Sequence, residues 1–189
     1  MVGMPIPYVM KARDHIVIFL VFTVGVFALG AQDMDEELRR GFRDVILGLS
    51  FEETEERLAA DLAFQYRGQP DVSMRLSDGE SVIDTRGRLY VDRGLFQFSN
   101  GTLYSMALYL DRGRLDYFQL YEQLRGRYGE PVDLDPQRSV WQDQATRIEL
   151  ERPLTVKYLD LARFEERRAS QETLEAAEDV ARDQFLEEF

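Results

Sequence analysis

The clearest structural signal in this 189-residue chain is the run Leu95-Phe96-Gln97-Phe98-Ser99-Asn100-Gly101-Thr102-Leu103-Tyr104-Ser105-Met106-Ala107-Leu108-Tyr109-Leu110. Apolar side chains dominate both sides of Asn100-Gly101, a dipeptide that tolerates the positive φ angles of a two-residue type I′ turn. The run therefore predicts a β-hairpin in which Phe98 faces Leu103 and Gln97 faces Tyr104. Because both of its faces carry apolar side chains, we expect part of the hairpin to be covered on both sides.

Shorter runs before and after this hairpin predict further antiparallel strands. Val72, Met74 and Leu76 alternate before a turn at Asp78-Gly79, and Val82-Ile83 follows that turn. Later in the chain, 146–151 and 154–158 alternate and are joined by Arg152-Pro153, while Val140-Trp141 begins a shorter strand. In the later pair, Ile148 and Leu150 point to one face and charged residues to the other, which predicts a sheet with one wet face.

Three shorter helices and one long helix are expected around these strands. Apolar residues at helical spacing predict helices at 34–47 and 51–64, the second with an S-x-x-E capping box at Ser50 and Glu53. A third helix at 115–128 ends at Gly129. Residues 159–189 contain no Gly or Pro and are rich in Glu and Ala, which predicts a long, mostly solvated helix that either packs back on the body or meets a partner.

The predicted fold class is therefore α+β, with short helices packed on antiparallel β-meanders and a long acidic C-terminal helix. The domain boundaries expected are a leader at 1–31, an α+β domain at 32–160 and the helix at 161–189. Helix 51–64 leads into strands that end near Leu110, and helix 115–128 leads into strands that end near Tyr158. This order suggests an internal repeat of structure, although the two halves show no matching residues.

The N-terminus predicts export. Lys11 and Arg13 precede an apolar run from Ile16 to Ala31 that ends in small residues, the pattern of a signal peptide cleaved after Gly30 or Ala31. Sixteen residues are short for a membrane span, which needs about 20, but an uncleaved inner-membrane anchor stays open as the alternative. No Cys follows the run, so no lipid acceptor is present. The expected location is periplasmic or extracellular.

Composition removes several kinds of chemistry. The chain has no Cys, and its one His, His15, lies in the leader, so disulfides, thiol nucleophiles, Cys or His zinc sites and Ser-His-Asp triads are excluded from the mature protein. We predict no cofactor and no metal site. Removing 1–31 takes away Lys11, Arg13 and Asp14, which leaves 21 basic and 34 acidic residues and a formal charge of −13. Nucleic acid is therefore not an expected partner.

Two predicted helices meet at the turn Gly48-Leu49-Ser50-Phe51-Glu52-Glu53-Thr54, and a meander follows them. Over residues 34–110 this arrangement resembles small exported α+β domains of the BamE (SmpA/OmlA) outer-membrane assembly type. The lipidated Cys of that family is absent here, and Leu62-Ala63-Phe64 replaces the Gly-x-Pro that usually follows the second helix. The resemblance implies a non-catalytic envelope protein.

Two classes of function follow from these observations. The preferred one is an exported, non-catalytic binding or scaffolding protein of the bacterial envelope that contacts a protein partner. Its candidate partner-binding residues are Tyr104, Tyr109, Trp141, Leu174, Ala181 and Phe185. The alternative is a carboxylate-based periplasmic hydrolase, which requires acidic groups such as Glu149, Glu151 and Asp143 to converge in a pocket. No catalytic residue is predicted under the preferred function.

Overall fold

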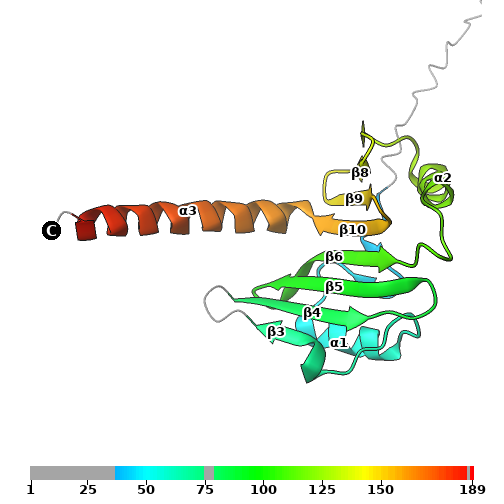
Figure 1. Ribbon diagram of the computed structural model, residues 1–189, viewed down its shortest axis with the longest axis horizontal. Helices are drawn as coiled ribbons and strands as arrows, with labels where there is room; N and C mark the ends of the chain where they lie inside the picture. Colours follow the sequence, from blue (N-terminus) through cyan, green and yellow to red (C-terminus); the bar gives the residue numbers. More distant parts are fainter. Residues whose placement is uncertain (1–36, 75–78, 187) are drawn as a thin grey trace, which may run out of the picture. The chain divides into compact units, whose positions relative to one another are not determined.

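The computed structural model describes residues 37–74, 79–186 and 188–189. Its main element is an eight-stranded antiparallel sheet with strand order β3-β4-β5-β6-β10-β9-β8-β7 (Figure 1). The strands of this sheet are β3 (Val72–Met74), β4 (Glu80–Arg86), β5 (Val91–Ser99), β6 (Thr102–Leu110), β7 (Asp133–Leu134), β8 (Arg138–Gln142), β9 (Thr146–Glu151) and β10 (Thr155–Asp160). The remaining elements are a separate hairpin of β1 (Gly41–Phe42) and β2 (Val45–Ile46), the helices α1 (Phe51–Ala60), α2 (Tyr117–Tyr128) and α3 (Leu161–Leu186), and the 3-10 helix η1 (Gln69–Asp71). The predicted α+β class is confirmed, including the long C-terminal helix.

The two halves of the chain repeat one order of elements. Helix α1 precedes the four strands β3 to β6, and α2 precedes the four strands β7 to β10. The last strand of each half pairs with the other in antiparallel register, from Tyr109 opposite Thr155 to Ser105 opposite Leu159. Two meanders are thereby joined into one sheet.

The hairpin of β5 and β6 forms around the predicted turn. Asn100 and Gly101 have φ angles of 49° and 74°, as a type I′ turn requires, and Phe98 pairs with Leu103. The expected pairing of Gln97 with Tyr104 is wrong, because Gln97 pairs with Ser105. The register shifts between Gln97 and Phe98, so Tyr104 is the extra residue of a β-bulge.

The helix expected at 34–47 is wrong where the structure describes it. Residues 41–46 form the β1–β2 hairpin, with Arg43 at a φ of 52°. Gly41 allows the two strands to approach closely, since a Cβ there would lie 2.2 Å from the carbonyl oxygen of Val45. The next two residues, Gly48 and Leu49, pair with β6: Gly48 N–H donates to the carbonyl of Leu103, and Leu103 N–H donates to the carbonyl of Leu49. These long-range hydrogen bonds override the helical periodicity.

Helix α1 begins as expected and ends four residues earlier than expected. Ser50 and Glu53 form the predicted capping box. The helix stops at Ala60 because the next residues pair elsewhere: Arg88 N–H donates to Ala63 O, and Phe64 bridges Gly87. The ring of Phe64 is buried against Phe96, with 5.5 Å between ring centroids. Tertiary packing of this aromatic side chain therefore sets the end of the helix.

The hydrophobic core lies on one face of the sheet, beneath α1 and α2. Helix α1 contributes Leu58 and helix α2 contributes Leu124, and each such buried side chain stabilises the fold by about 1.5–3 kcal/mol. In Figure 1 α1 lies behind β3 and β4. The sheet supplies the largest buried side chains, among them Trp141, Phe96, Phe98, Leu103, Met106, Leu108, Ile148 and Leu150.

Helix α3 is anchored at its beginning. The guanidinium of Arg167 lies 5.7 Å from the ring centroid of Tyr104 and forms an ion pair with Glu80. From Arg168 to Leu186, every side chain that the structure describes is exposed. The apolar residues Val180, Phe185 and Leu186 therefore remain in solvent.

The predicted leader, residues 1–31, lies outside the described residues, as do Leu76 and Asp78 of the β3–β4 turn. Among the described helices, none is long and apolar enough to cross a membrane.

Substituting Ser50 by Ala tests the capping box. Ser50→Ala removes the oxygen that accepts Glu53 N–H at 3.2 Å, and we expect the free energy of unfolding to fall by about 1 kcal/mol. Urea denaturation measures the change. Glu56→Gln, an exposed substitution on the same helix, is the matched control and should change the value by less than about 0.5 kcal/mol. An unchanged Ser50→Ala protein would contradict the assigned cap.

Truncations test where α3 stops contributing to the fold. Every side chain that the structure describes between 169 and 189 is exposed, so deleting 169–189 should shift the thermal midpoint by less than about 2 °C. Deleting 165–189 also removes Arg167 with its contacts to Glu80 and Tyr104, and should lower the midpoint further. Equal losses from the two truncations, measured by circular dichroism, would show that the distal helix packs on the body.

Candidate protein-binding surface

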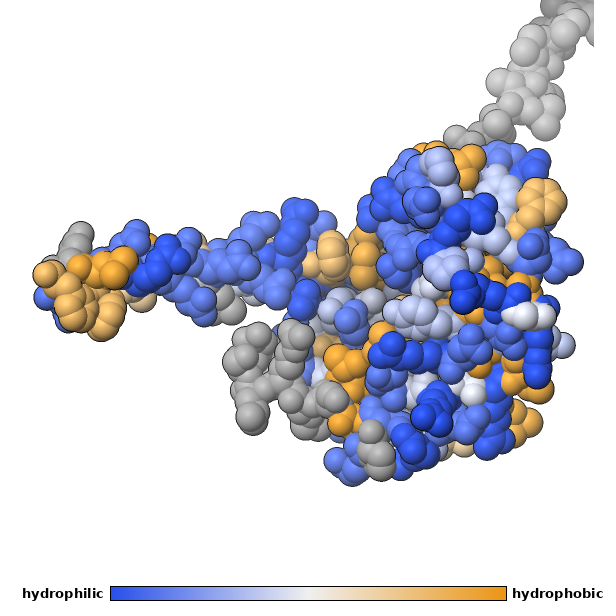
Figure 2. All heavy atoms as spheres, in the orientation of Figure 1, coloured by the Kyte–Doolittle hydropathy of each residue, from blue (hydrophilic) through white to orange (hydrophobic). Residues whose placement is uncertain are grey.

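The face of the sheet opposite the core has no described helix across its centre. We call it the open face and define it by cross-strand neighbours, which point to the same side of a sheet. One continuous row crosses seven strands and consists of Asp84, Leu95, Ala107, Lys157, Glu149, Val140 and Asp133. Figure 2 shows hydrophilic residues over most of this face, with hydrophobic ones between them.

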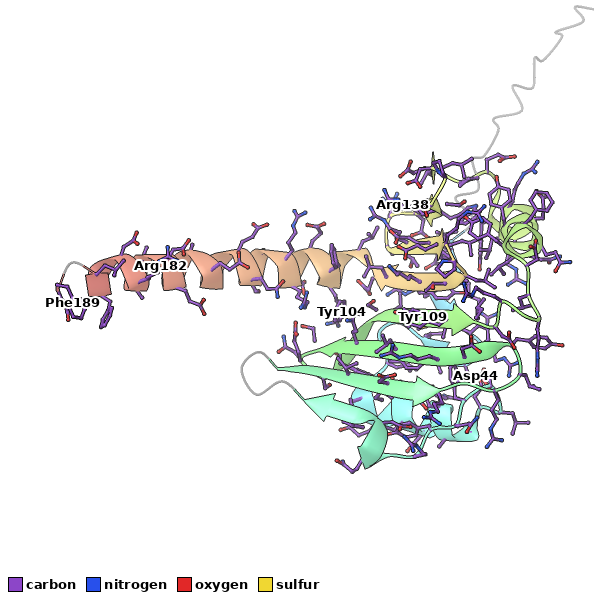
Figure 3. The ribbon with its side chains drawn as sticks, viewed as in Figure 1. Asp44, Tyr104, Tyr109, Arg138, Arg182 and Phe189 are labelled. Carbon is purple, nitrogen blue, oxygen red and sulfur yellow. The ribbon has the colours of Figure 1, made fainter. Side chains whose placement is uncertain are left out.

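The centre of the open face is apolar and aromatic. Leu95 and Ala107 are directly paired and half-buried. Beside them lies Tyr109 (Figure 3), which is 36% exposed. Its ring lies 5.5 Å from the guanidinium carbon of Arg93. An accessible Tyr held by an Arg is typical of the residues that anchor protein interfaces.

Ion pairs surround this centre and fix its charged side chains. Arg93 donates two hydrogen bonds of 2.7 Å to the two carboxylate oxygens of Asp84. Lys157 donates to Glu151 at 2.7 Å. Pairs of this kind contribute little to stability at a surface, but they place charged groups at the edge of the apolar centre, as a polar rim would.

Glu149 is the most strongly desolvated acid on the open face. Its side chain is only 14% exposed, and its closest cation is Arg147, with 3.7 Å between Nη1 and Oε1. Burial raises the pKa of Glu149, the charges of Lys157 and Arg147 oppose that rise, and the neighbouring Glu151 adds to it. Glu149 is therefore a largely buried carboxylate whose charge the nearby cations offset only in part.

The three carboxylates named for a hydrolase do not converge. Glu149 and Glu151 lie on the open face near cations. Asp143 lies in the β8–β9 turn, where it accepts backbone N–H groups from Leu38, Ala145 and Thr146 at 2.7–2.8 Å. Although burial opposes it, these hydrogen bonds lower the pKa of Asp143, which is the wrong direction for a general acid at neutral pH.

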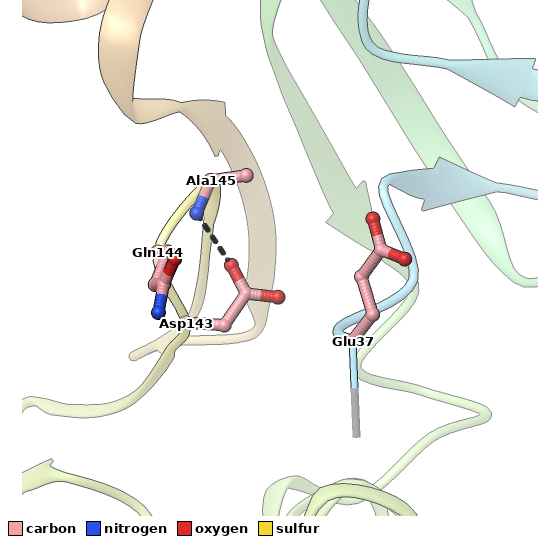
Figure 4. A pocket seen from close by; sticks show the side chains of 4 residues that line it. All are labelled: Glu37, Asp143, Gln144 and Ala145. Atoms are coloured by element: carbon pink, nitrogen blue, oxygen red, sulfur yellow. Dashed lines mark hydrogen bonds between the residues drawn. The ribbon is translucent and has the colours of Figure 1, made fainter. Parts of the chain in front are cut away.

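A hollow of about 410 Å³ lies beside Asp143 and is lined by Glu37, Asp143, Gln144 and Ala145 (Figure 4). The bond from Ala145 N–H keeps the Asp143 carboxylate within its own turn. Across the described residues, no group of three or more His, Cys, Asp or Glu is placed to hold a metal ion.

The structure separates the predicted partner-binding residues into three groups. Trp141 is buried in the core and donates from Nε1 to the carbonyl of Gly129 at 2.9 Å, and Tyr104 is buried beside Arg167, so neither is available at the surface. Tyr109 lies on the open face. On α3, Ala181 and Phe185 are exposed, whereas the side chain of Leu174 is outside the described part of the chain.

Sequence reasoning missed Arg93, Asp84 and Lys157 as members of this surface. Each comes from a different strand, and only the register of β4, β5 and β10 brings them beside Tyr109. The alternation of 91–99 could have indicated which of its residues lie opposite the core. It could not have indicated the neighbouring strand.

Comparison with family models shows that the TP0088 domain matches residues 40–170. This covers more than half of the chain. The chain belongs to the TP0088 domain family. The matched region begins at the β1–β2 hairpin and ends three residues after Arg167, so it contains the whole sheet and the anchored beginning of α3. The comparisons with curated proteins and with solved structures found no match.

Replacing Glu149 tests the electrostatics of the open face. The raised pKa means that the folded protein binds more protons than the unfolded chain between the ordinary value of 4.5 and the raised value. Stability therefore falls as pH rises through that window. Glu149→Gln should be more stable than the native protein at pH 7, and the difference should shrink at about pH 4.

Urea denaturation at the two pH values measures this effect. Glu151→Gln, which loses the bond from Lys157, is the matched control and should show no gain. A Glu149→Gln protein that is less stable than the native protein at pH 7 would contradict the assigned desolvation.

Proposed function

We propose that this member of the TP0088 domain family is an exported, non-catalytic protein of the bacterial envelope that binds a protein partner through the open face. The observation that carries the proposal is the arrangement around Tyr109, where half-buried apolar side chains are surrounded by fixed ion pairs. Protein interfaces have this anatomy of an apolar or aromatic centre and a polar rim.

The dimensions of the open face suit a protein rather than a small ligand. With about 4.8 Å between neighbouring strands, eight strands span roughly 34 Å. The central strands β5 and β6 contain nine residues each, and nine residues extend over about 30 Å. A stable interface needs about 800 Å² from each partner, which an area of this size can supply.

The charge of the chain indicates the kind of partner. The full sequence carries a formal charge of −12, and the desolvated Glu149 lies in the row that crosses the centre of the open face. A cationic side chain placed against Glu149 would complete the compensation that Arg147 and Lys157 begin. The partner is therefore a protein with a basic surface and an apolar group that contacts Tyr109.

Export and localisation rest on the leader. The basic residues, the apolar run and the small residues Ala28, Gly30 and Ala31 support secretion followed by cleavage, with an uncleaved inner-membrane anchor as the alternative. N-terminal sequencing of the protein from cells separates the two: Ala31 or Gln32 as the first residue supports release, and an intact leader supports anchoring.

Site-specific photo-crosslinking in cells tests the binding surface. A photoreactive phenylalanine at Tyr109 should form a crosslink with one protein, whereas the same group at the exposed Glu56 of α1 should not. Glu149→Lys should abolish the Tyr109 crosslink, because it places a like charge against the basic partner.

Purified components complete the test. The crosslinked protein should bind the native chain with an affinity that falls as salt rises, and Glu149→Lys should weaken binding by about tenfold or more. The matched control is Glu56→Lys, which makes the same charge change on α1 and should bind normally. Equal crosslinking at positions 109 and 56, or normal binding by Glu149→Lys, would refute the proposed surface.

A further inference from the structure

A second surface feature lies at the end of the sheet near the beginning of α2, on the covered side. It is a cavity of about 390 Å³ between the first turn of α2, the β7–β8 turn and the β9–β10 turn. Ser139 pairs with the core residue Leu150, which places this cavity on the opposite side from the open face. We call it the Arg152 pocket, and its lining residues are Asp116, Tyr117, Phe118, Tyr121, Leu134, Asp135, Pro136, Ser139 and Arg152.

The apolar part of the pocket is unusually accessible. Phe118 is 65% exposed and Leu134 is 61% exposed, although both are large apolar side chains. Phe118 stacks on Tyr121 with 6.5 Å between ring centroids and an interplanar angle of 26°. Two aromatic rings and a leucine therefore form an open wall that could receive one apolar group.

Arg152 supplies the only positive charge among the lining residues. Its guanidinium carbon lies 4.1 Å from the ring centroid of Tyr117, and its Nε donates to the carbonyl of Pro136 at 3.0 Å. These contacts fix the plane of the guanidinium. In the described part of the chain Arg152 forms no ion pair, so both Nη groups remain available to a planar anion such as a carboxylate.

The two acidic lining residues are already engaged by the protein. Asp116 caps α2, with Oδ1 accepting the N–H groups of Phe118 and Gln119. Asp135 accepts two backbone N–H groups and the side chain of Arg138, and the hydrogen bond from Gln137 N–H is the largest cause that lowers its pKa. Neither carboxylate makes a bond to Arg152.

The polar floor of the pocket is fixed in the same way. The hydroxyl of Tyr117 lies 3.2 Å from the Oγ of the buried Ser139 and donates to the carbonyl of Leu150 at 3.2 Å. The ring that supports Arg152 is therefore held at both its face and its hydroxyl. A cation in a fixed position beside an open aromatic wall meets the requirements for recognising a carboxylate next to an apolar group.

We propose that the Arg152 pocket binds an apolar carboxylate, with the carboxylate on the Nη groups of Arg152 and the apolar group against Phe118 and Leu134. The C-terminal residue of an extended peptide has this chemistry, and so does a small aromatic acid. The pocket volume of about 390 Å³ suits one such group. This proposal does not depend on the partner of the open face.

Titration of the purified full-length chain with matched probes tests the proposal, with amide chemical shifts followed by NMR. N-acetyl-phenylalanine should shift the amides of 117–121, 134–135 and 137–139. N-acetyl-phenylalanine amide has a neutral carboxamide in place of the carboxylate and should bind about tenfold more weakly. The tetrapeptide acetyl-Gly-Ser-Gly-Phe separates the two sources: tighter binding than N-acetyl-phenylalanine supports a peptide terminus, and equal binding supports a small aromatic acid.

Variants separate the two halves of the pocket. Arg152→Gln should abolish the preference for the acid over the amide, whereas the matched control Arg147→Gln on the open face should retain it. Phe118→Ala should weaken both probes by several-fold, and the spectrum of each free variant checks its fold. Three results would overturn the proposal. The first is the absence of shifts at a probe concentration of about 20 mM, since a weaker affinity would be near the limit of useful recognition. The others are equal binding of acid and amide, and an Arg152→Gln protein that keeps the preference for the acid.

Discussion

The pairing of β6 with β10 is the interaction on which the rest of the structure depends. Each half of the chain is a helix followed by a four-stranded meander, and a small meander of this kind has an exposed edge at its last strand. Between Ser105 and Tyr109, the backbone of β6 pairs with β5 on one side and β10 on the other. Each half thereby covers the exposed edge strand of the other, and the two halves share a single core beneath α1 and α2.

This seam also assembles the chemistry of the open face. Tyr109 and Ala107 come from the first half, and Lys157 comes from the second half, directly opposite Ala107. The row continues to Glu149 on β9, so the desolvated acid and the aromatic centre lie on one continuous surface only because the halves are joined. The Arg152 pocket, in contrast, is built entirely from α2 and strands of the second half. The two surfaces can therefore be altered independently.

Local patterns predicted most of the elements in this fold. The Asn100-Gly101 turn, the capping box at Ser50 and the stop at Gly129 depend on neighbours in sequence, and all three are present. The failures have long-range causes. The segment at 41–46 forms a hairpin because the chain that follows it hydrogen-bonds to β6, and α1 ends early because Phe64 packs against Phe96.

The surfaces were less predictable than the elements, for the same physical reason. Trp is a residue type that is common in interfaces, but the ring of Trp141 is buried and its indole N–H donates to the carbonyl of Gly129. Tyr109 is accessible, and its neighbours Arg93 and Lys157 follow only from strand register. Arg152 was visible in the sequence only as part of a turn, and its stacking on Tyr117 requires the packing of α2.

Native-state hydrogen exchange of the purified chain tests the central claim that β6 and β10 join two meanders into one cooperative sheet. If they do, the amides of the paired residues 105–109 and 155–159 should exchange only by global unfolding, with one common free energy of opening and one dependence on denaturant. Independent opening of the two halves, with residues 155–159 exchanging at a lower free energy than 105–109, would contradict the account.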